Sequence, residues 1–168
     1  MDEPNLGENE GHPGFDVDAM LGKLAKWLRI LGFDAAYPCV APSKGRIFVS
    51  ARKQAPFPID VIITSTRLAE QLKELFEQTD IRPNPALLFS RCLLCNRPVQ
   101  EIPKEKLSSK VPPVVFQNIE TFHQCPGCGR IYWEGSHVEQ TRRRVDQLMA
   151  SVTCQCTQTC SRNSATRG

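Results

Sequence analysis

Residues 15–34 decide the fold, and they read Phe15-Asp-Val-Asp18-Ala-Met-Leu-Gly22-Lys-Leu-Ala-Lys-Trp-Leu-Arg29-Ile-Leu-Gly32-Phe-Asp34. Residues 15–18 are typical of a short strand that ends in a carboxylate. From residue 19 to residue 31 the apolar residues recur at helical spacing, which predicts a helix with one buried stripe: Met20, Leu24, Trp27, Leu28 and Leu31. Gly32 is the expected end of that helix.

The next fifty residues continue the pattern of strands and helices. Strands are expected at residues 33–37, 46–50 and 59–64. Pro38 should end the first of them, and Ser65 or Thr66 should cap a helix from residue 67 to about residue 78. This order predicts an α/β fold, with a small parallel-sheet layer over residues 15–85.

Four of the eight cysteines form two CxxC pairs, Cys92 with Cys95 and Cys125 with Cys128. A two-residue spacer lets both thiolates of a tight turn face one tetrahedral metal ion. Four thiolates complete the coordination shell and leave no position for water or substrate. The spacing therefore predicts a structural Zn²⁺ site, not a catalytic one.

Two alternatives to a zinc site account less well for the CxxC pairs. Four unrelated buried cysteines would not be expected as matched pairs beside strand-like segments. A redox CxxC is expected as a single motif beside a βαβ unit. Of the remaining cysteines, Cys39 is expected to be a small apolar filler. Cys154, Cys156 and Cys160 could form a second metal site or lie in a disordered tail.

The second half of the chain is predicted to be a zinc ribbon with a C-terminal helix, over residues 86–150. Short strands are expected at residues 114–116, 121–122 and 130–133. Ser136-His-Val-Glu139 has the pattern of a capping box that opens a helix to about residue 150.

The two ends of the chain differ in composition from the parts between them. Residues 1–14 and 151–168 are expected to be disordered. The N-terminus has no signal-peptide pattern, and no apolar run is long enough to span a membrane. These features predict an intracellular protein, cytoplasmic or nuclear, in which the cysteines stay reduced.

Charge is distributed unevenly along the sequence. Residues 1–19 carry six acids and no Lys or Arg, so the remaining residues, with 21 basic and 12 acidic side chains, have a formal charge of +9. Such a charge suits RNA or another polyanionic partner, although it is also compatible with ordinary solubility charge.

Asp18 is the strongest catalytic candidate in the sequence. A carboxylate at the end of a parallel strand, just before a helix, faces the crevice in which α/β sheets bind ligands. There it could hold Mg²⁺ or Mn²⁺ for hydrolysis of a phosphodiester. The alternative is that Asp18 caps the following helix.

Basic side chains supply candidates for nucleic-acid contacts: Lys23, Lys26, Arg29, Arg142, Arg143 and Arg144. The alternative for each group is a solvated helix face. Tyr132 and Trp133 could stack on bases if exposed, or pack the small ribbon instead. His137 could act as an acid, a base or a phosphate contact, but a lone His is usually structural.

Three stretches of the sequence belong together: residues 15–34, Ser90-Arg-Cys92-Leu-Leu-Cys95-Asn96, and Phe122-His-Gln-Cys125-Pro-Gly-Cys128-Gly-Arg-Ile-Tyr132-Trp133-Glu-Gly-Ser-His137. Together they resemble the mut-seven C-terminal RNase domain family. The resemblance spans about residues 15–150. It implies a PIN-like, metal-dependent ribonuclease layer followed by a zinc ribbon. Asp18 then corresponds to the first acidic metal ligand, and the four paired cysteines to the zinc ligands. Asn96 and His137 correspond to characteristic polar positions of the family.

The sequence departs from this family at the expected active site. The family has a helix of about 15 residues after the second strand, where this chain has only residues 38–44. The family's Thr-Arg-Asp after the third strand corresponds to Ser50-Ala-Arg52, which replaces an acid with a cation. Asp34 and Asp60 are weak substitutes. We therefore expect a truncated layer with an incomplete active site. The alternative function is a catalytically inactive nucleic-acid-binding module.

Overall fold

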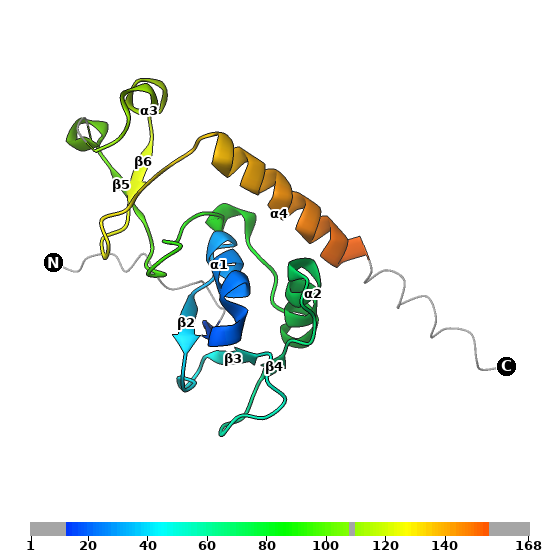
Figure 1. Ribbon diagram of the computed structural model, residues 1–168. Helices are drawn as coiled ribbons and strands as arrows, with labels where there is room; N and C mark the ends of the chain where they lie inside the picture. Colours follow the sequence, from blue (N-terminus) through cyan, green and yellow to red (C-terminus); the bar gives the residue numbers. More distant parts are fainter. Residues whose placement is uncertain (1–12, 108–109, 155–168) are drawn as a thin grey trace.

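The computed structural model describes residues 13–107 and 110–154 (Figure 1). Its strands are β1 (Phe15–Asp18), β2 (Ala35–Cys39), β3 (Ile47–Ser50), β4 (Val61–Ile62), β5 (Gln100–Ile102), β6 (Phe122–Gln124) and β7 (Ile131–Trp133). Its α-helices are α1 (Gly22–Ile30), α2 (Leu68–Thr79), α3 (Pro113–Asn118) and α4 (Ser136–Cys154), with short 3₁₀ turns at Ala19–Leu21, Pro85–Leu87 and Lys104–Leu107. The expectations for residues 1–12 and 155–168, including Cys156 and Cys160, lie outside the described residues.

The first four strands form a parallel sheet in the order β2-β1-β3-β4. Phe15 of β1 pairs with Ala35 on one side and with Ile47 on the other. Because the strands are parallel, their carboxyl ends lie at the same edge of the sheet, and Asp18 lies at that edge. The predicted α/β layer is therefore confirmed.

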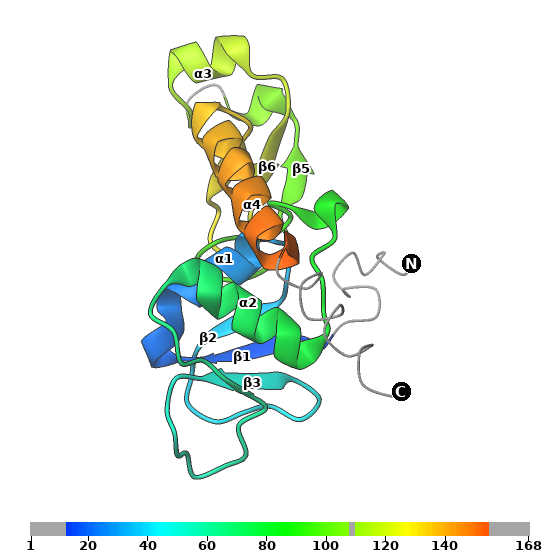
Figure 2. The same ribbon diagram turned by 90° about the vertical axis from the view of Figure 1, so that its right-hand side faces the viewer.

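Helices α1 and α2 lie on the same face of this sheet, and α4 crosses above them (Figures 1 and 2). Their apolar stripes meet the sheet in one core, in which Leu24, Leu28, Leu72 and Phe76 have no exposed surface. Val145 of α4 belongs to the same core. The C-terminal helix thus packs on the α/β layer, although it follows the ribbon in sequence.

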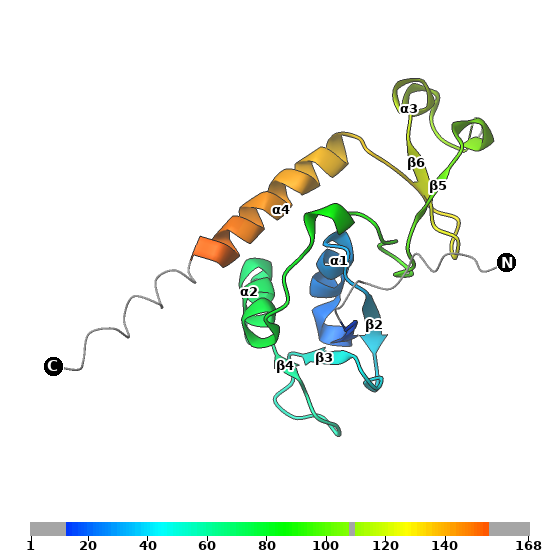
Figure 3. The same ribbon diagram turned by 180° about the vertical axis from the view of Figure 1, so that it is seen from behind.

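A connection covers part of the opposite face of the sheet. Phe57, in the segment that follows β3, packs edge-on against Phe48 with ring centroids 5.2 Å apart. Phe48 is consequently 2% exposed. No helix in the described part of the chain covers this face (Figure 3).

Strands β5, β6 and β7 form a separate antiparallel sheet in that order. Its own core of buried side chains consists of Leu107, Val111 and Phe122, with a few half-buried neighbours. A core of this size supplies little stability by itself, and such small modules usually need a metal ion or a disulfide.

Two predicted strand segments differ from the structure. Residues 114–116 lie in α3, because two prolines precede them and Pro113 occupies the first turn, where the missing N–H costs nothing. The β-branched valines alone indicated a strand there. Of residues 59–64, only Val61 and Ile62 form a strand, and Ile62 is 41% exposed, since β4 is at the sheet edge.

Several predicted element ends are also wrong. Pro38 lies inside β2, which continues to Cys39. The N-cap of α2 is Arg67, which makes no side-chain cap bond. Ser136, predicted as the N-cap of the last helix, is instead the first residue of α4, and the Gly135 carbonyl accepts from the N–H groups of Val138 and Glu139. It ends at Cys154 instead of about residue 150, so the first residues of the predicted tail are helical.

None of the helices described over residues 13–107 and 110–154 is long and apolar enough to cross a membrane.

The turn after α1 gives a test of the packing between the layer and the ribbon. Gly32 has a φ of +91°, and a Cβ there would collide with the backbone carbonyl of Leu87. Gly45 has a φ of +81°, but no atom lies within 4 Å of the Cβ that a substitution would add there. Gly45→Ala should lower the free energy of unfolding by about 1–2 kcal/mol, and Gly32→Ala by clearly more, in urea denaturation. Equal losses would contradict the tight packing at Gly32.

Candidate functional site

The sulfurs of Cys92, Cys95, Cys125 and Cys128 lie within 4.8 Å of one another. The Sγ–Sγ distances are 3.4 Å between Cys92 and Cys95, 3.2 Å between Cys95 and Cys125, and 3.6 Å between Cys92 and Cys128. A tetrahedral ion with bonds of about 2.3 Å places its sulfurs about 3.8 Å apart. One ion could therefore be bound by all four sulfurs after small movements.

The two CxxC turns have the same backbone design. In the first, Cys92 N–H donates to the Arg97 carbonyl and Asn96 N–H donates to the Cys92 carbonyl. In the second, Cys125 and Gly129 make the equivalent bonds, at 2.9 Å each. Asn96 and Gly129 have φ values of +64° and +71°. A left-handed residue after the second cysteine closes each turn, and Asn and Gly are the residues that adopt this conformation most readily.

The first turn also favours a thiolate at Cys92. Burial raises its pKa, but hydrogen bonds from the Cys95 N–H, the Tyr132 hydroxyl and the Leu94 N–H lower the pKa to about 6. In contrast, the neighbouring sulfurs, Cys125 first, and burial raise the pKa of Cys95 to about 12. The first turn therefore favours a thiolate at Cys92, whereas Cys95 ionises readily only with a cation beside it.

Arg29 connects the α/β layer to this cluster, and it is not the phosphate contact that the sequence suggested. Its side chain is buried, with the residue 5% exposed. Its Nε and Nη2 atoms donate to the Ala35 carbonyl, and Nη1 donates to the carbonyls of Leu93 and Leu94 inside the first CxxC turn, at 2.8 Å each. These bonds commit the guanidinium to a structural role.

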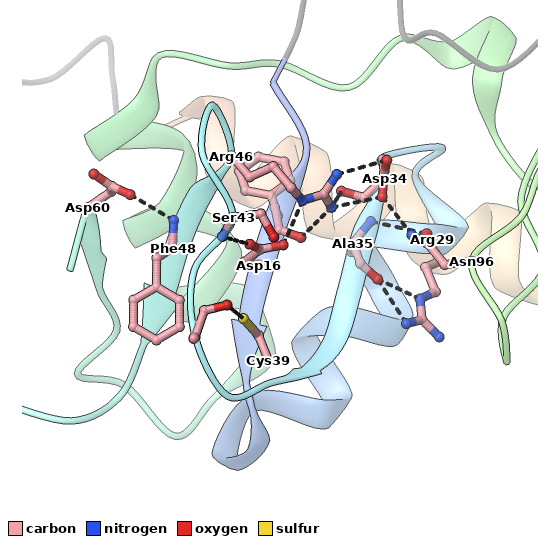
Figure 4. A network of polar contacts seen from close by, with 12 residues as sticks. Asp16, Arg29, Asp34, Ala35, Cys39, Ser43, Arg46, Phe48, Asp60 and Asn96 are labelled. Atoms are coloured by element: carbon pink, nitrogen blue, oxygen red, sulfur yellow. Dashed lines mark hydrogen bonds and ion pairs between the residues drawn. The ribbon is translucent and has the colours of Figure 1, made fainter. Parts of the chain in front are cut away.

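Asn96 makes a second connection at the same place (Figure 4). Its side-chain oxygen accepts from the N–H of Ala35 at 3.0 Å, and its amide nitrogen donates to Asp34 at 2.6 Å. Burial raises the pKa of Asp34, but hydrogen bonds from Arg46 and Asn96 outweigh it and hold the pKa below its usual range. The carboxylate is therefore an acceptor for the ribbon and for Arg46.

The other acids near the sheet are also engaged in structure. Asp16 accepts from Arg46 Nε and from the Ser43 N–H, at 2.6 Å each. Asp60 accepts from the N–H of Phe48 at 2.8 Å (Figure 4). Asp34 and Asp60, the possible substitute metal ligands, thus lie in separate networks and not beside Asp18.

Asp18 is 3% exposed at the carboxyl edge of the sheet. One carboxylate oxygen accepts from the N–H of Met20 at 3.1 Å, the bond expected of a helix cap. The other accepts from the Ser50 hydroxyl at 2.8 Å and pairs with Arg52 Nε at 3.0 Å. Both oxygens of this carboxylate are therefore engaged with hydrogen-bond donors.

The remaining basic candidates differ in environment. Lys23 and Lys26 are exposed on α1. In α4, Arg142 pairs with Glu134 at 3.1 Å and Arg143 with Glu139 at 2.6 Å. Arg144 lies over the ring of Trp27, 5.6 Å from its centroid. The α4 arginines thus have intramolecular partners, whereas no such partner is seen for the two lysines within the described residues.

The comparisons with known proteins identify the family. A model described as the Mut7-C RNAse domain matches residues 13–145, which is most of the chain. The chain belongs to the Mut7-C RNAse domain family. No curated protein and no solved structure matches it significantly.

The catalytic Mg²⁺ or Mn²⁺ implied by the Mut7-C resemblance does not fit the residues around Asp18. A divalent ion there needs several oxygen ligands, and carboxylates supply most of them. Within the described residues, the four cysteines are the only set of three or more His, Cys, Asp or Glu side chains that come together. At Asp18 the nearest charged group is the Arg52 guanidinium, which repels a metal ion.

The sequence did not indicate that two further arginines belong to this network. Arg46 and Arg91 are held inside it, and Arg91 Nη1 donates to the Asn96 carbonyl at 2.8 Å. Nothing in their sequence neighbourhoods distinguishes them from surface arginines. Asn96 is a polar position of the Mut7-C pattern, and the structure shows its contact with Asp34.

The four-cysteine cluster predicts one bound ion per chain. Cys92→Ser should abolish that ion and unfold β5, β6 and β7, because a thiolate ligand is lost and the local core is small. Cys39, whose sulfur contacts the Ala41 carbonyl, is the matched control, and Cys39→Ser should keep the ion. Elemental analysis and NMR spectra of the two variants test this. A folded ribbon in the metal-free wild-type chain would contradict it.

The structural role of Arg29 predicts a stability effect. Arg29→Ala leaves the carbonyls of Ala35, Leu93 and Leu94 without their side-chain donor, so the free energy of unfolding should fall by about 3 kcal/mol or more. Lys26→Ala, on the exposed face of the same helix, should change it by about 0.5 kcal/mol or less. Urea denaturation measures both, and similar values would show that Arg29 is not a structural link.

Proposed function

We propose that this chain is an RNA-binding member of the Mut7-C RNAse domain family that does not cleave RNA. The observation that carries the proposal is the environment of Asp18. Both oxygens of its carboxylate are engaged, one by the Met20 N–H and the other by the Ser50 hydroxyl and Arg52. Metal-dependent hydrolysis of a phosphodiester requires a cluster of carboxylates around the ions, and no such cluster forms at Asp18 in the described part of the chain.

Family membership and charge support RNA as the partner. The family is described by an RNase domain, which acts on RNA. From residue 20 onward the chain has 21 basic and 12 acidic residues, an excess that favours a polyanion. The exposed lysines of α1 could contribute to such binding.

We propose Zn²⁺ as the ion of the ribbon. Four thiolates with no open position are the typical donor set of structural zinc, since soft ligands select it over Mg²⁺ or Ca²⁺. Its role is to hold the ribbon in place. Such a cluster needs reduced cysteines, which supports an intracellular location, cytoplasmic or nuclear.

A cleavage assay tests the loss of catalysis. Purified zinc-loaded chain is incubated with labelled single-stranded RNA in Mg²⁺ or Mn²⁺, beside the Asp18→Asn variant prepared in the same way. We expect no cleavage above background from either protein, because Asp18 cannot assemble a metal site. Cleavage by the wild type that is lost in Asp18→Asn would show that the chain is an active ribonuclease.

A binding assay tests the partner. Filter binding to a single-stranded RNA is measured at several salt concentrations. The logarithm of the association constant should fall linearly with the logarithm of the salt concentration, because binding releases cations from the phosphates. Absence of salt-dependent binding would reject RNA as the partner and favour a purely structural zinc protein.

A further inference from the structure

Two segments at the carboxyl edge of the parallel sheet carry basic side chains beside Asp18. They are residues 19–23, which follow β1, and residues 51–58, which follow β3. These segments contain Lys23, Arg52 and Lys53 and no acid. All three basic residues are exposed. Ligands of α/β sheets bind at this edge, outside the carboxyl ends of the strands.

Arg52 is held in a fixed position at this edge. Its Nε pairs with Asp18 at 3.0 Å, and its backbone N–H donates to the Ser50 hydroxyl at 3.0 Å. That hydroxyl in turn donates to Asp18. The side chain nevertheless remains 54% exposed, and no described residue accepts a hydrogen bond from its Nη atoms. A guanidinium anchored through Nε loses little conformational freedom when its outer N–H groups bind a second anion.

A small hollow lies beside Arg52. It has a volume of about 130 Å³, and Asp18 and Arg52 supply its charged lining. Its apolar wall includes Pro38, Val40 and Phe57. This volume is well below the range of about 300–1,000 Å³ that encloses a whole ligand. The hollow therefore suits one unit of a longer chain, with a charged group at Arg52 and an apolar or aromatic face against the wall.

We infer that the carboxyl edge binds the phosphodiester backbone of single-stranded RNA without a divalent metal. Arg52 donates from its Nη atoms to a phosphate, Lys53 and Lys23 add charge along the strand, and the wall with Pro38 and Val40 contacts a ribose or base. The protein's own cation thus occupies the edge where metal-dependent chemistry would require metal ions. This inference rests on the RNA binding proposed above and assigns that binding to the carboxyl edge of the sheet.

The simplest rival to this role is that Arg52 only neutralises the buried Asp18. A variant that removes both charges separates the two ideas. Asp18→Asn/Arg52→Gln leaves no unpaired buried carboxylate and does not change the net charge of the chain. Lys106→Gln, an exposed position on the ribbon, lowers the net charge by one elsewhere and is the matched control.

Filter binding of the zinc-loaded full chain to a single-stranded RNA, as a function of salt, is the test. For the double variant we expect about fivefold weaker binding in 0.1 M monovalent salt, and a slope of log K against log salt smaller by about 0.7, the loss of one phosphate contact. Lys106→Gln should keep the wild-type slope. Thermal unfolding shows whether both variants are folded. If the double variant is unfolded, the measurement is repeated with Lys53→Gln, which leaves the ion pair of Asp18 and Arg52 intact.

Each outcome decides between named possibilities. A normal slope in both the double variant and Lys53→Gln would overturn the inference while leaving RNA binding in place. An equal loss in Lys106→Gln would also overturn it, because the loss would then not be specific to the carboxyl edge. Binding that requires added Mg²⁺ at constant ionic strength would show that a metal contacts the phosphate, and would overturn the metal-free mode. If the wild type does not bind RNA, the proposed function fails as well.

Discussion

The junction between the sheet and the first CxxC turn depends on one buried guanidinium. Arg29 donates to the Ala35 carbonyl on one side and to the Leu93 and Leu94 carbonyls on the other, so a single side chain bonds the backbones of both modules. Separating the modules would break the bonds to Leu93 and Leu94, and a hydrogen bond from a charged donor contributes about 1.5–3 kcal/mol to stability. An ion bound by the four cysteines would order this turn and would thereby also fix the position of the ribbon on the layer.

The carboxyl edge of the sheet combines a parallel architecture with an ion pair at Asp18, where no cluster of acids comes together in the described residues. A parallel sheet still places Asp18 at the end of β1, beside the residues that follow β3. Arg52 at that second position forms an ion pair where a metal ligand set would need a further acid. The Ser50 hydroxyl and Arg52 supply partners for the buried carboxylate of Asp18 within the chain itself.

The sequence allowed the local elements and the cluster to be predicted, because both depend on short-range patterns. Helical spacing located α1 and α2, and the CxxC spacing located all four sulfurs of the cluster. Burial of single polar residues was not predictable. Arg29 has the same spacing as the exposed Lys26, and only the tertiary position of Leu93 distinguishes them. For α3, a proline outweighed the β-branched residues after it.

Helix α4 has a practical consequence for work with fragments of this chain. The family match stops at residue 145, but the helix continues to Cys154. Val152, 5% exposed, is a member of the core shared with α1 and α2. A protein expressed to the edge of the match would retain every cysteine of the cluster and still leave a gap in the hydrophobic interior of the other module. Expression boundaries for this chain are therefore better set by the last turn of α4 than by the limits of homology.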